Sequence, residues 1–281
     1  MKLLRFGAAG AEKPGLLDAD GGLRDLSGEV DDIAGEALSE AGLDRLRALD
    51  AQALPRIDGS PRLGPPVART QKLIAVGLNY VDHAAEAGMP IPEEPILFSK
   101  AVSCISGPND DIVLQPHVTK GDWEVELAIV IGRTATNIGE EEGLDHVAGY
   151  TICNDVSERA FQLESTGQWL KGKSLDTFGP IGPWLVTRDE VPDPHGLALW
   201  LDVNGERRQS GNTSNMIFSV PKLVSYISRF MTLVPGDVIA TGTPPGVAMG
   251  MDEPPWLKPG DRMHLGVEGL GEQVQTVVAM P

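Results

Sequence analysis

Three carboxylates occupy every second position at the start of an apolar segment: Asp122, Glu124 and Glu126, followed by the run 127–131. In a β-strand, successive side chains alternate between two faces, so these three carboxylates would share one face. The apolar continuation predicts a buried strand, and buried carboxylates repel one another and are costly to remove from water. A divalent cation is the simplest group that would offset this cost. A solvated strand end with ordinary charges is the alternative.

Asp155 is the best candidate for a third ligand of such a cation. It follows the apolar segment 148–153, which predicts a strand, and precedes a segment from Ser157 that is typical of a helix start. A carboxylate at the end of a buried strand would point into a cleft. All-oxygen ligands favour Mg²⁺, Mn²⁺ or Ca²⁺ over Zn²⁺, and an incompletely filled Mg²⁺ shell leaves positions for substrate oxygens.

A histidine and a glutamate form a candidate general base. If residues 82–87 are helical, His83 and Glu86 are three positions apart and lie on one face. An imidazole that is oriented by a carboxylate can take a proton from water. The proline-containing segment 88–95 that follows is interpreted as a lid. The alternative is a surface helix that carries an incidental pair.

Two further segments could hold an anionic substrate. Lys171 and Lys173 lie among glycine and apolar residues, and either could place an ammonium against an anion, although both could equally be solvated loop lysines. The spacing of these lysines does not separate them. Residues 241–246 follow an apolar strand and offer hydroxyls and N–H groups that could bind a carboxylate or simply form a turn.

The composition describes a globular chain without a nucleic-acid or membrane signature. The sequence has 281 residues and a formal net charge of −17, so no phosphate-binding surface is expected and nucleic acid is disfavoured as a partner. No apolar run reaches the ~18 residues that cross a membrane, and Arg5 and Gly7 interrupt the start too early for a signal peptide. Cys104 and Cys153 both have apolar neighbours, which favours a reducing, cytoplasmic location.

The chain divides by pattern into two parts and a linker. Residues 1–60 predict a small N-terminal accessory domain with three short strands and a helical segment, 33–49, that Gly42 interrupts. Segment 61–70 continues a proline- and glycine-rich stretch and is interpreted as a linker. Residues 71–281 contain many short apolar strands separated by turns, which is typical of a mixed or antiparallel sheet folded on itself and disfavours a TIM barrel.

One convincing helix interrupts the strands of the larger part. Ser219 would cap its N-terminus, and Pro221 would lie in its first turn. The apolar positions that follow have helical spacing and predict a buried stripe. These positions are Leu223, Val224, Ile227, Phe230 and Met231.

Five motifs occur in the order found in one known enzyme family. They are Gly77-Leu78-Asn79-Tyr80 with His83 and Glu86, Asp122-Trp123-Glu124-Val125-Glu126-Leu127, Asn154-Asp155-Val156-Ser157-Glu158-Arg159 with Gln162, Lys171-Gly172-Lys173-Ser174, and Thr241-Gly242-Thr243-Pro244. Together they resemble the fumarylacetoacetate hydrolase (FAH) family over residues 70–281. The N-terminal part and the segment 176–180 resemble a bacterial branch that includes ureidoglycolate lyase, 2,4-diketo-3-deoxy-L-fuconate hydrolase and acylpyruvate hydrolases.

The resemblance implies an α+β, β-rich fold, in which an FAH-type mixed β-roll catalytic domain, residues 71–281, carries a small N-terminal α/β accessory domain. It also implies a homodimer and a divalent cofactor. Glu124, Glu126 and Asp155 match the family's ligands for Mg²⁺ or Mn²⁺, with Ca²⁺ as a substitute in crystals. Asp122 is expected to support the neighbouring loop rather than the metal.

The resemblance also implies catalytic and substrate-binding roles. His83 and Glu86 match a water-activating pair, and Lys173 matches a lysine that orients the substrate and stabilises charge. Matches to substrate contacts are Arg159, Gln162 and Thr243. One departure is Leu78, where related acylpyruvate hydrolases often have arginine, so that substrate contact is not expected here.

The reaction implied is hydrolysis of a C–C bond in a small-molecule keto acid, either an acylpyruvate or a 2,4-diketo-3-deoxy sugar acid. The substrate would chelate the metal, His83 would deprotonate water, and the bond would break through a metal-bound enolate beside Lys173. Alternatives at the same metal site are a ureidoglycolate lyase and an oxaloacetate decarboxylase or hydratase. A catalytically silent ligand-binding scaffold is the non-enzyme alternative. The presence of His83 and Glu86 favours hydrolysis.

Overall fold

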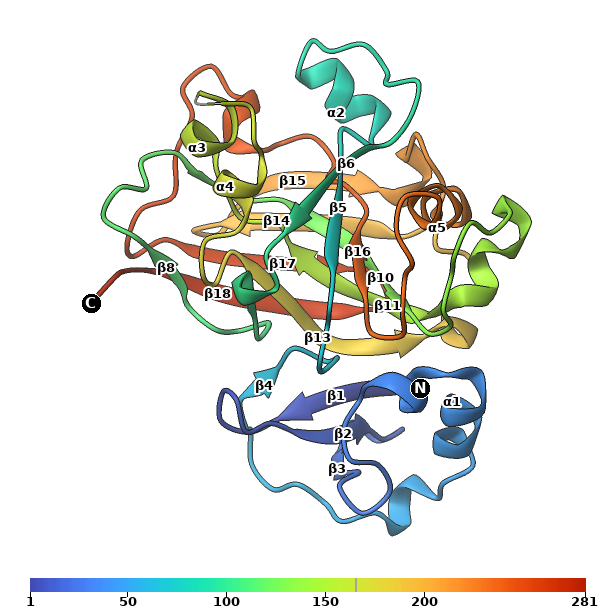
Figure 1. Ribbon diagram of the computed structural model, residues 1–281. Coiled ribbons are helices and arrows are strands. Elements are labelled where there is room, and N and C mark those ends of the chain that lie inside the picture. Colours follow the sequence, from blue (N-terminus) through green and yellow to red (C-terminus); the bar gives the residue numbers. More distant parts are fainter. Residues whose placement is uncertain (165) are drawn as a thin grey trace.

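The computed structural model describes residues 1–164 and 166–281. The fold is α+β and rich in β-strands, as predicted, with two larger sheets and short helices. In Figure 1 the N-terminal strands lie at the bottom of the molecule, below the main body that the rest of the chain forms.

The larger sheet runs through the whole molecule. Within the described residues it contains 11 strands, nine of them in a continuous order β3-β2-β1-β13-β11-β10-β16-β5-β6. Its pairs are mainly antiparallel, and β16 with β5 is a parallel exception, which makes the sheet mixed. Its strands are β1 (Lys2–Phe6), β2 (Lys13–Leu17), β3 (Leu23–Asp25), β4 (Leu63–Gly64), β5 (Leu73–Gly77), β6 (Ile96–Lys100), β7 (Ile105–Ser106), β10 (Val125–Ile131), β11 (Val147–Asn154), β13 (Gly179–Thr187) and β16 (Val238–Ala240).

A second sheet packs on one face of the first, in the order β15-β14-β17-β18-β8. A turn at Asn204-Gly205 joins two of its strands, and the φ angles of 55° and 80° are those of a type I′ hairpin. A separate two-stranded sheet is formed by β9 (Gly121–Asp122) and β12 (Ser157–Glu158). The strands of the second sheet are β8 (Ile112–Leu114), β14 (Ala198–Val203), β15 (Glu206–Asn212), β17 (Arg262–Val267) and β18 (Gly271–Ala279).

Strand β10 is the centre of the core, and all of its residues are buried. Leu127 and Ile129 belong to the core between the two sheets, whereas Ala128 and Val130 belong to the core beneath the N-terminal strands. This alternation confirms the predicted two-sided burial of the strand. Trp123 and Glu124 interrupt the predicted strand between β9 and β10.

The N-terminal segment extends the large sheet, because β1 pairs antiparallel with β13 through Leu3 and Leu185. The prediction that Gly42 interrupts a helix is wrong. Gly42 lies inside α1 (Glu40–Arg47), where Ser39 caps the helix by accepting from the Gly42 N–H at 3.0 Å. A Cβ at this position would lie 2.1 Å from a backbone oxygen, so glycine permits close packing here. The domain boundary near residue 60 stays a prediction.

Helix α5 (Val220–Ser228) confirms the predicted cap, since the Ser219 hydroxyl accepts from the Lys222 N–H. Leu223, Val224 and Ile227 are buried as predicted, but Phe230 is 62% exposed. The prediction for Phe230 is wrong because the helix ends at Ser228 and the stripe does not continue past it.

The remaining helices are short. Within residues 1–164 and 166–281, none has the length and apolarity needed to cross a membrane. Helices α2, α3 and α4 lie at the end of the main body opposite the N-terminal strands (Figure 1). They are α2 (Val81–Glu86), α3 (Arg159–Leu163) and α4 (Leu170–Lys173), and the 3₁₀ turns are Gly35–Leu38, Ala51–Ala53, Val102–Cys104, Glu140–His146, Arg188–Glu190, Thr213–Asn215 and Ala248–Gly250.

Candidate metal centre and active site

Three carboxylates meet at the end of strands β10 and β11. Glu124, Glu126 and Asp155 each offer an oxygen within 4.8 Å of the others, and all three are buried. The register explains this meeting, since Val125 pairs with Asn154 and the Asp155 N–H donates to the Glu124 carbonyl at 2.9 Å. The structure therefore brings together the three residues that the sequence selected as metal ligands.

Buried cations surround these carboxylates. Lys173 Nζ lies 2.6 Å from Glu124 Oε2 and 2.9 Å from Asp155 Oδ2, so it bridges two of the three. Arg159 lies 2.5 Å from Glu124 Oε1, and Lys100 lies 2.5 Å from Asp155 Oδ1. Each of these buried charges is tolerated because an opposite charge lies beside it.

The cluster holds one more negative than positive side chain. Four buried carboxylates stand against three buried cations, which leaves one carboxylate in excess. The carboxylates are Asp122, Glu124, Glu126 and Asp155, and the cations are Lys100, Arg159 and Lys173.

Glu126 carries this excess. Among the described residues it makes no direct ion pair, and it accepts one hydrogen bond, from the Gly242 N–H at 2.8 Å. Burial and the neighbouring charges of Asp155 and Glu124 raise the pKa of Glu126 well above its ordinary value. For Glu124, burial opposes ionisation, but the charges of Lys173 and Arg159 lower its pKa to about 2.

The donor set fits a hard divalent cation. All three side chains offer oxygen, the ligand type that Mg²⁺, Mn²⁺ and Ca²⁺ prefer. A cation held by Glu124, Glu126 and Asp155 would also compensate the charge of Glu126. Among these three carboxylates, Glu126 is the one for which the described residues provide no ion pair.

The structure separates the two lysines that the sequence could not. Helix α4 directs Lys173 into the cluster, where it is 1% exposed, whereas Lys171 is exposed and donates to Thr166 at 3.1 Å. Lys173 Nζ also lies 5.3 Å from the centre of the Phe98 ring.

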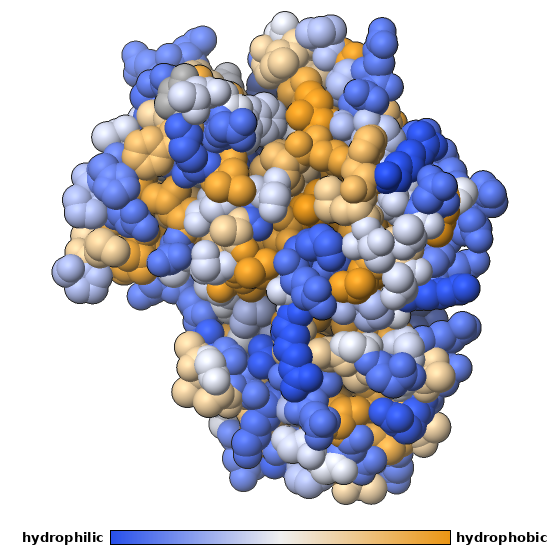
Figure 2. Space-filling model, in the orientation of Figure 1, coloured by the Kyte–Doolittle hydropathy of each residue, from blue (hydrophilic) through white to orange (hydrophobic). Residues whose placement is uncertain are grey.

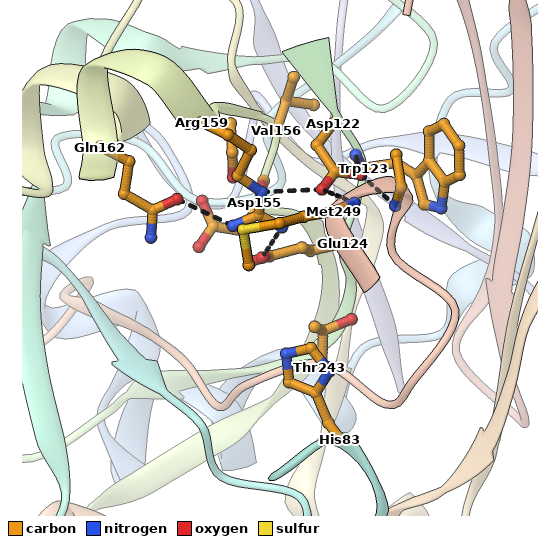
Figure 3. Close-up of polar contacts among 12 residues, drawn as sticks. His83, Asp122, Trp123, Glu124, Asp155, Val156, Arg159, Gln162, Thr243 and Met249 are labelled. Carbon is orange, nitrogen blue, oxygen red and sulfur yellow. Dashed lines mark hydrogen bonds and ion pairs between the residues drawn. The ribbon is translucent and has the colours of Figure 1, made fainter. Parts of the chain in front are cut away.

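Asp122 supports the site from behind, as expected. Its carboxylate accepts from Arg159 Nε at 2.8 Å and from the backbone N–H groups of Ala248 and Met249. Arg159 donates in turn to Gln162 Oε1 at 2.9 Å, so this guanidinium is held on three sides (Figure 3). Asp122 thus fixes the position of Arg159 and ties β9 to the turn near residue 248.

The predicted histidine–glutamate pair exists on α2. His83 Nδ1 lies 2.9 Å from Glu86 Oε2, and Glu86 Oε1 accepts from the Gly246 N–H at 2.8 Å. A carboxylate bound at Nδ1 favours the tautomer that leaves Nε2 able to accept a proton. In Figure 3 the His83 ring lies across an open space from Glu124, Arg159 and Gln162.

His83, Glu124 and Glu126 line one cavity of about 170 Å³. A larger hollow of about 570 Å³ lies over the N-terminal segment and shares no residue with this cluster. Thr243 also lines the cavity, with its hydroxyl donating to the Val125 carbonyl and accepting from Gln209. The polar residues of the cavity are His83, Glu124, Glu126, Arg159, Gln162, Lys173 and Thr243.

Two residues of the site were missed by the sequence analysis. Lys100, at the end of β6, pairs with Asp155, and Gln209, on β15, accepts from the Val125 N–H at 2.9 Å and donates to Thr243. Neither has a local signal, because each lies far along the chain from the residue it contacts.

Comparison with known proteins agrees with this combination of a β-rich fold and a buried acidic cluster in a cavity. The profile of the fumarylacetoacetate (FAA) hydrolase C-terminal family matches residues 72–278. The chain belongs to this family, which confirms the resemblance. A protein of Burkholderia ambifaria named as a hydrolase is 60% identical over 277 residues, which cover 98% of each chain.

Solved structures agree over the full chain. A protein from Mycobacterium smegmatis described as HpcE is 38% identical with a TM-score of 0.90, and the match covers 100% of both chains. Maleylpyruvate hydrolase from Sphingobium sp. SYK-6, in complex with manganese(II) and pyruvate, is 31% identical with a TM-score of 0.84 and 100% coverage of both. A 2-hydroxyhepta-2,4-diene-1,7-dioate isomerase from Mycobacterium marinum is 33% identical, with a TM-score of 0.74 and coverage of 99% of this chain and 98% of that one.

Proposed function

We propose that this protein is a divalent-metal-dependent hydrolase that cleaves a C–C bond in a 2,4-diketo acid. The observation that carries the proposal is that one cavity is lined by both parts of the required machinery, the carboxylates Glu124 and Glu126 and the base His83. The similarity to a hydrolase of known structure with manganese and pyruvate supports the same chemistry.

Glu124, Glu126 and Asp155 are the residues that would hold Mg²⁺ or Mn²⁺. A divalent cation bound there would supply Lewis-acid chemistry for a keto-acid substrate. The oxygen donors support this assignment, and so does the raised pKa of Glu126, because a bound cation would compensate the charge of this buried carboxylate.

His83 begins the reaction by taking a proton from water at Nε2 while Glu86 holds Nδ1 and stabilises the imidazolium. The activated water adds to the 4-keto carbon of the substrate. The bond between the third and fourth carbons then breaks, and the three-carbon fragment gains a proton to become pyruvate. The other product is a carboxylic acid, so one water is consumed for each bond cleaved.

Lys173 supplies positive charge near the position at which negative charge develops on the keto-acid fragment. Its ammonium is held by Glu124 and Asp155, so it is oriented before the substrate binds. Arg159, Gln162 and Thr243 line the same cavity and are proposed as substrate contacts.

Turnover of a substrate panel tests the proposal. The panel contains an acylpyruvate, a 2,4-diketo-3-deoxy sugar acid, ureidoglycolate and oxaloacetate, each with Mg²⁺ or Mn²⁺. We expect water-dependent cleavage of a 2,4-diketo acid with stoichiometric release of both fragments. Turnover of ureidoglycolate or oxaloacetate alone, or rearrangement of a keto acid without cleavage, would replace hydrolysis by lyase, decarboxylase or isomerase chemistry.

Two variants test the separate roles of metal and base. Glu126→Ala is expected to abolish metal-dependent activity, and undiminished activity would refute the ligand assignment. His83→Ala is expected to abolish hydrolysis and to leave Mn²⁺ binding, measured by calorimetry, close to that of the wild type. Loss of Mn²⁺ binding in His83→Ala would show that the base was misassigned.

A homodimer and a cytoplasmic location stay predictions from the sequence. An apolar edge supports the dimer, because β6 is the last strand of the large sheet and most of its residues are partly exposed. Sedimentation equilibrium of the purified chain would test it, and a single species with the monomer mass of 29.9 kDa would contradict it.

A further inference from the structure

The cavity is lined by charged and by apolar side chains. Nine of its 16 lining residues are apolar or glycine. The large side chains among them are Leu78, Met89, Phe98, Leu163, Trp169 and Met249. Figure 2 shows apolar surface in the notch between the projection that contains α2 and the one that contains α3 and α4.

Two of these side chains are partly exposed although they are apolar. Met89 is 51% exposed and Leu163 is 44% exposed, and both line the cavity. Exposed apolar side chains that border a cavity are typical of a surface that a ligand covers.

Two of the apolar lining residues form a closely packed aromatic wall. The rings of Phe98 and Trp169 meet edge to face with centroids 5.3 Å apart. Trp169 also lies against Gly77, where a Cβ would be only 2.6 Å from the indole ring. Glycine at position 77 therefore permits this placement of Trp169, and the wall adjoins Lys173, whose Nζ lies 5.3 Å from the Phe98 centroid.

The cations that line the cavity already have partners. Within the described part of the chain, two basic side chains line the cavity, Arg159 and Lys173. Arg159 is paired with Asp122 and Glu124, and Lys173 with Glu124 and Asp155. A second carboxylate at the far end of a substrate would be desolvated against apolar side chains without a cation to pair with, which is unfavourable. Hydroxyl groups there would lose hydrogen bonds to water in the same way.

From this division we infer that the group on the 4-keto side of the substrate is an uncharged, apolar acyl chain, and that Leu163, Phe98 and Trp169 select it. The inference rests on the proposed 2,4-diketo acid hydrolysis and names the class of substrate for that site. It favours alkyl acylpyruvates over 2,4-diketo diacids and over hydroxylated sugar acids.

Three acylpyruvates test the inference with the wild-type protein and Mn²⁺. They are acetylpyruvate, butanoylpyruvate and succinylpyruvate, of which the last replaces the terminal methyl of butanoylpyruvate by a carboxylate. Release of pyruvate is followed with lactate dehydrogenase. We expect kcat/KM to rise about threefold for each methylene that becomes buried, and to be at least ~10-fold lower for succinylpyruvate than for butanoylpyruvate, because an unpaired carboxylate is costly to desolvate.

A matched pair of variants tests the location of the selectivity. Leu163→Lys introduces a cation at the cavity, whereas Leu170→Lys introduces one at a residue of similar exposure, 45%, outside it. We expect Leu163→Lys to shift the ratio of kcat/KM values toward succinylpyruvate by roughly 3- to 5-fold, the upper end of the range of an exposed ion pair. Leu170→Lys should leave the ratio within about twofold of the wild type, because solvent and salt screen an exposed charge that lies outside the cavity.

The outcomes separate this inference from the proposed function. If butanoylpyruvate and succinylpyruvate are cleaved equally well, or the diacid is preferred, the apolar-tail inference is overturned and the hydrolase proposal stands. If the 2,4-diketo-3-deoxy sugar acid of the panel is cleaved and none of the three acylpyruvates is, the inference is overturned and the hydrolase proposal stands. If none of these 2,4-diketo acids is cleaved, the hydrolase proposal fails and the inference fails with it. An equal shift in both lysine variants would overturn the role of Leu163.

Discussion

Glu86→Gln is the substitution whose effect the structure defines most closely. Both oxygens of Glu86 are used, Oε2 by His83 Nδ1 at 2.9 Å and Oε1 by the Gly246 N–H at 2.8 Å. In the variant, the Gly246 N–H requires the amide oxygen of glutamine, so the amide NH₂ faces His83. Nδ1 must then accept, which places the proton on Nε2 and removes the base from the cavity.

The size of the effect follows from the cost of restoring the active tautomer. Turning the amide would leave the Gly246 N–H unpaired, at about 1–3 kcal/mol, and the lost charged hydrogen bond to the forming imidazolium contributes roughly another 1.5–3 kcal/mol. The sum of about 2.5–6 kcal/mol corresponds to a loss in kcat of roughly a hundred- to ten-thousand-fold.

Steady-state hydrolysis of an acylpyruvate at saturating Mn²⁺ would measure this loss. Mn²⁺ affinity should not change, because Glu86 is not among the three clustered carboxylates. Glu93→Gln, which alters an exposed carboxylate in the segment after α2, is the matched control and should retain wild-type kcat. A kcat for Glu86→Gln within about threefold of the wild type would refute the assignment of His83 as the base, since general bases contribute roughly a hundredfold or more.

Three other predictions concern stability. Lys100→Met removes one cation from a buried ion pair and should lower the free energy of unfolding by about 3–5 kcal/mol; denaturant unfolding would measure this, and a change below about 1 kcal/mol would contradict it. Arg24 donates to Asp18 and lowers the pKa of that carboxyl, so the pair stabilises the fold at neutral pH and this contribution is lost as the pH falls through the lowered pKa. Asp18→Asn should therefore lower Tm at pH 7 and reduce the wild-type loss of Tm in acid, and a variant with an unchanged acid profile would count against the pair. Leu223→Ala should lower the free energy of unfolding by about 2–5 kcal/mol, because it leaves a cavity under α5. Phe230→Ala, on the surface, should lower it by less than ~0.5 kcal/mol. Equal losses in the two variants would contradict the observed end of the helix.

The carboxylate cluster could be predicted because its signal is local. Glu124 and Glu126 alternate with apolar residues, which identified the first strand end, and an unbroken apolar run before Asp155 identified the second. Choosing Lys173 over Lys171 needed the resemblance to a family, because spacing alone treats the two lysines alike.

Other features depend on contacts between distant segments. Lys100 follows an ordinary strand, and only the pairing of the large sheet brings it to Asp155, 55 positions away. Gly42 appeared to break a helix because the sequence does not reveal the close backbone approach that requires glycine there. Phe230 keeps the helical spacing of the apolar residues, although the helix ends at Ser228.

The apolar lining of the cavity could not be predicted from the sequence either, because it depends on the fold. Gly77, Phe98, Leu163 and Trp169 come from four separate segments, and each is unremarkable in its own local sequence. Their assembly around one cavity follows from the pairing of β5 with β6 and from the position of α3 and α4 above them.

The most direct test of the central claim is the stoichiometry of acetylpyruvate cleavage by chelator-treated protein as Mn²⁺ is added back. We expect no cleavage without metal and, on addition of Mn²⁺, equal amounts of pyruvate and acetate, with Glu126→Ala inactive throughout. Cleavage that proceeds equally well without metal, or no release of pyruvate and acetate at any Mn²⁺ concentration, would contradict it.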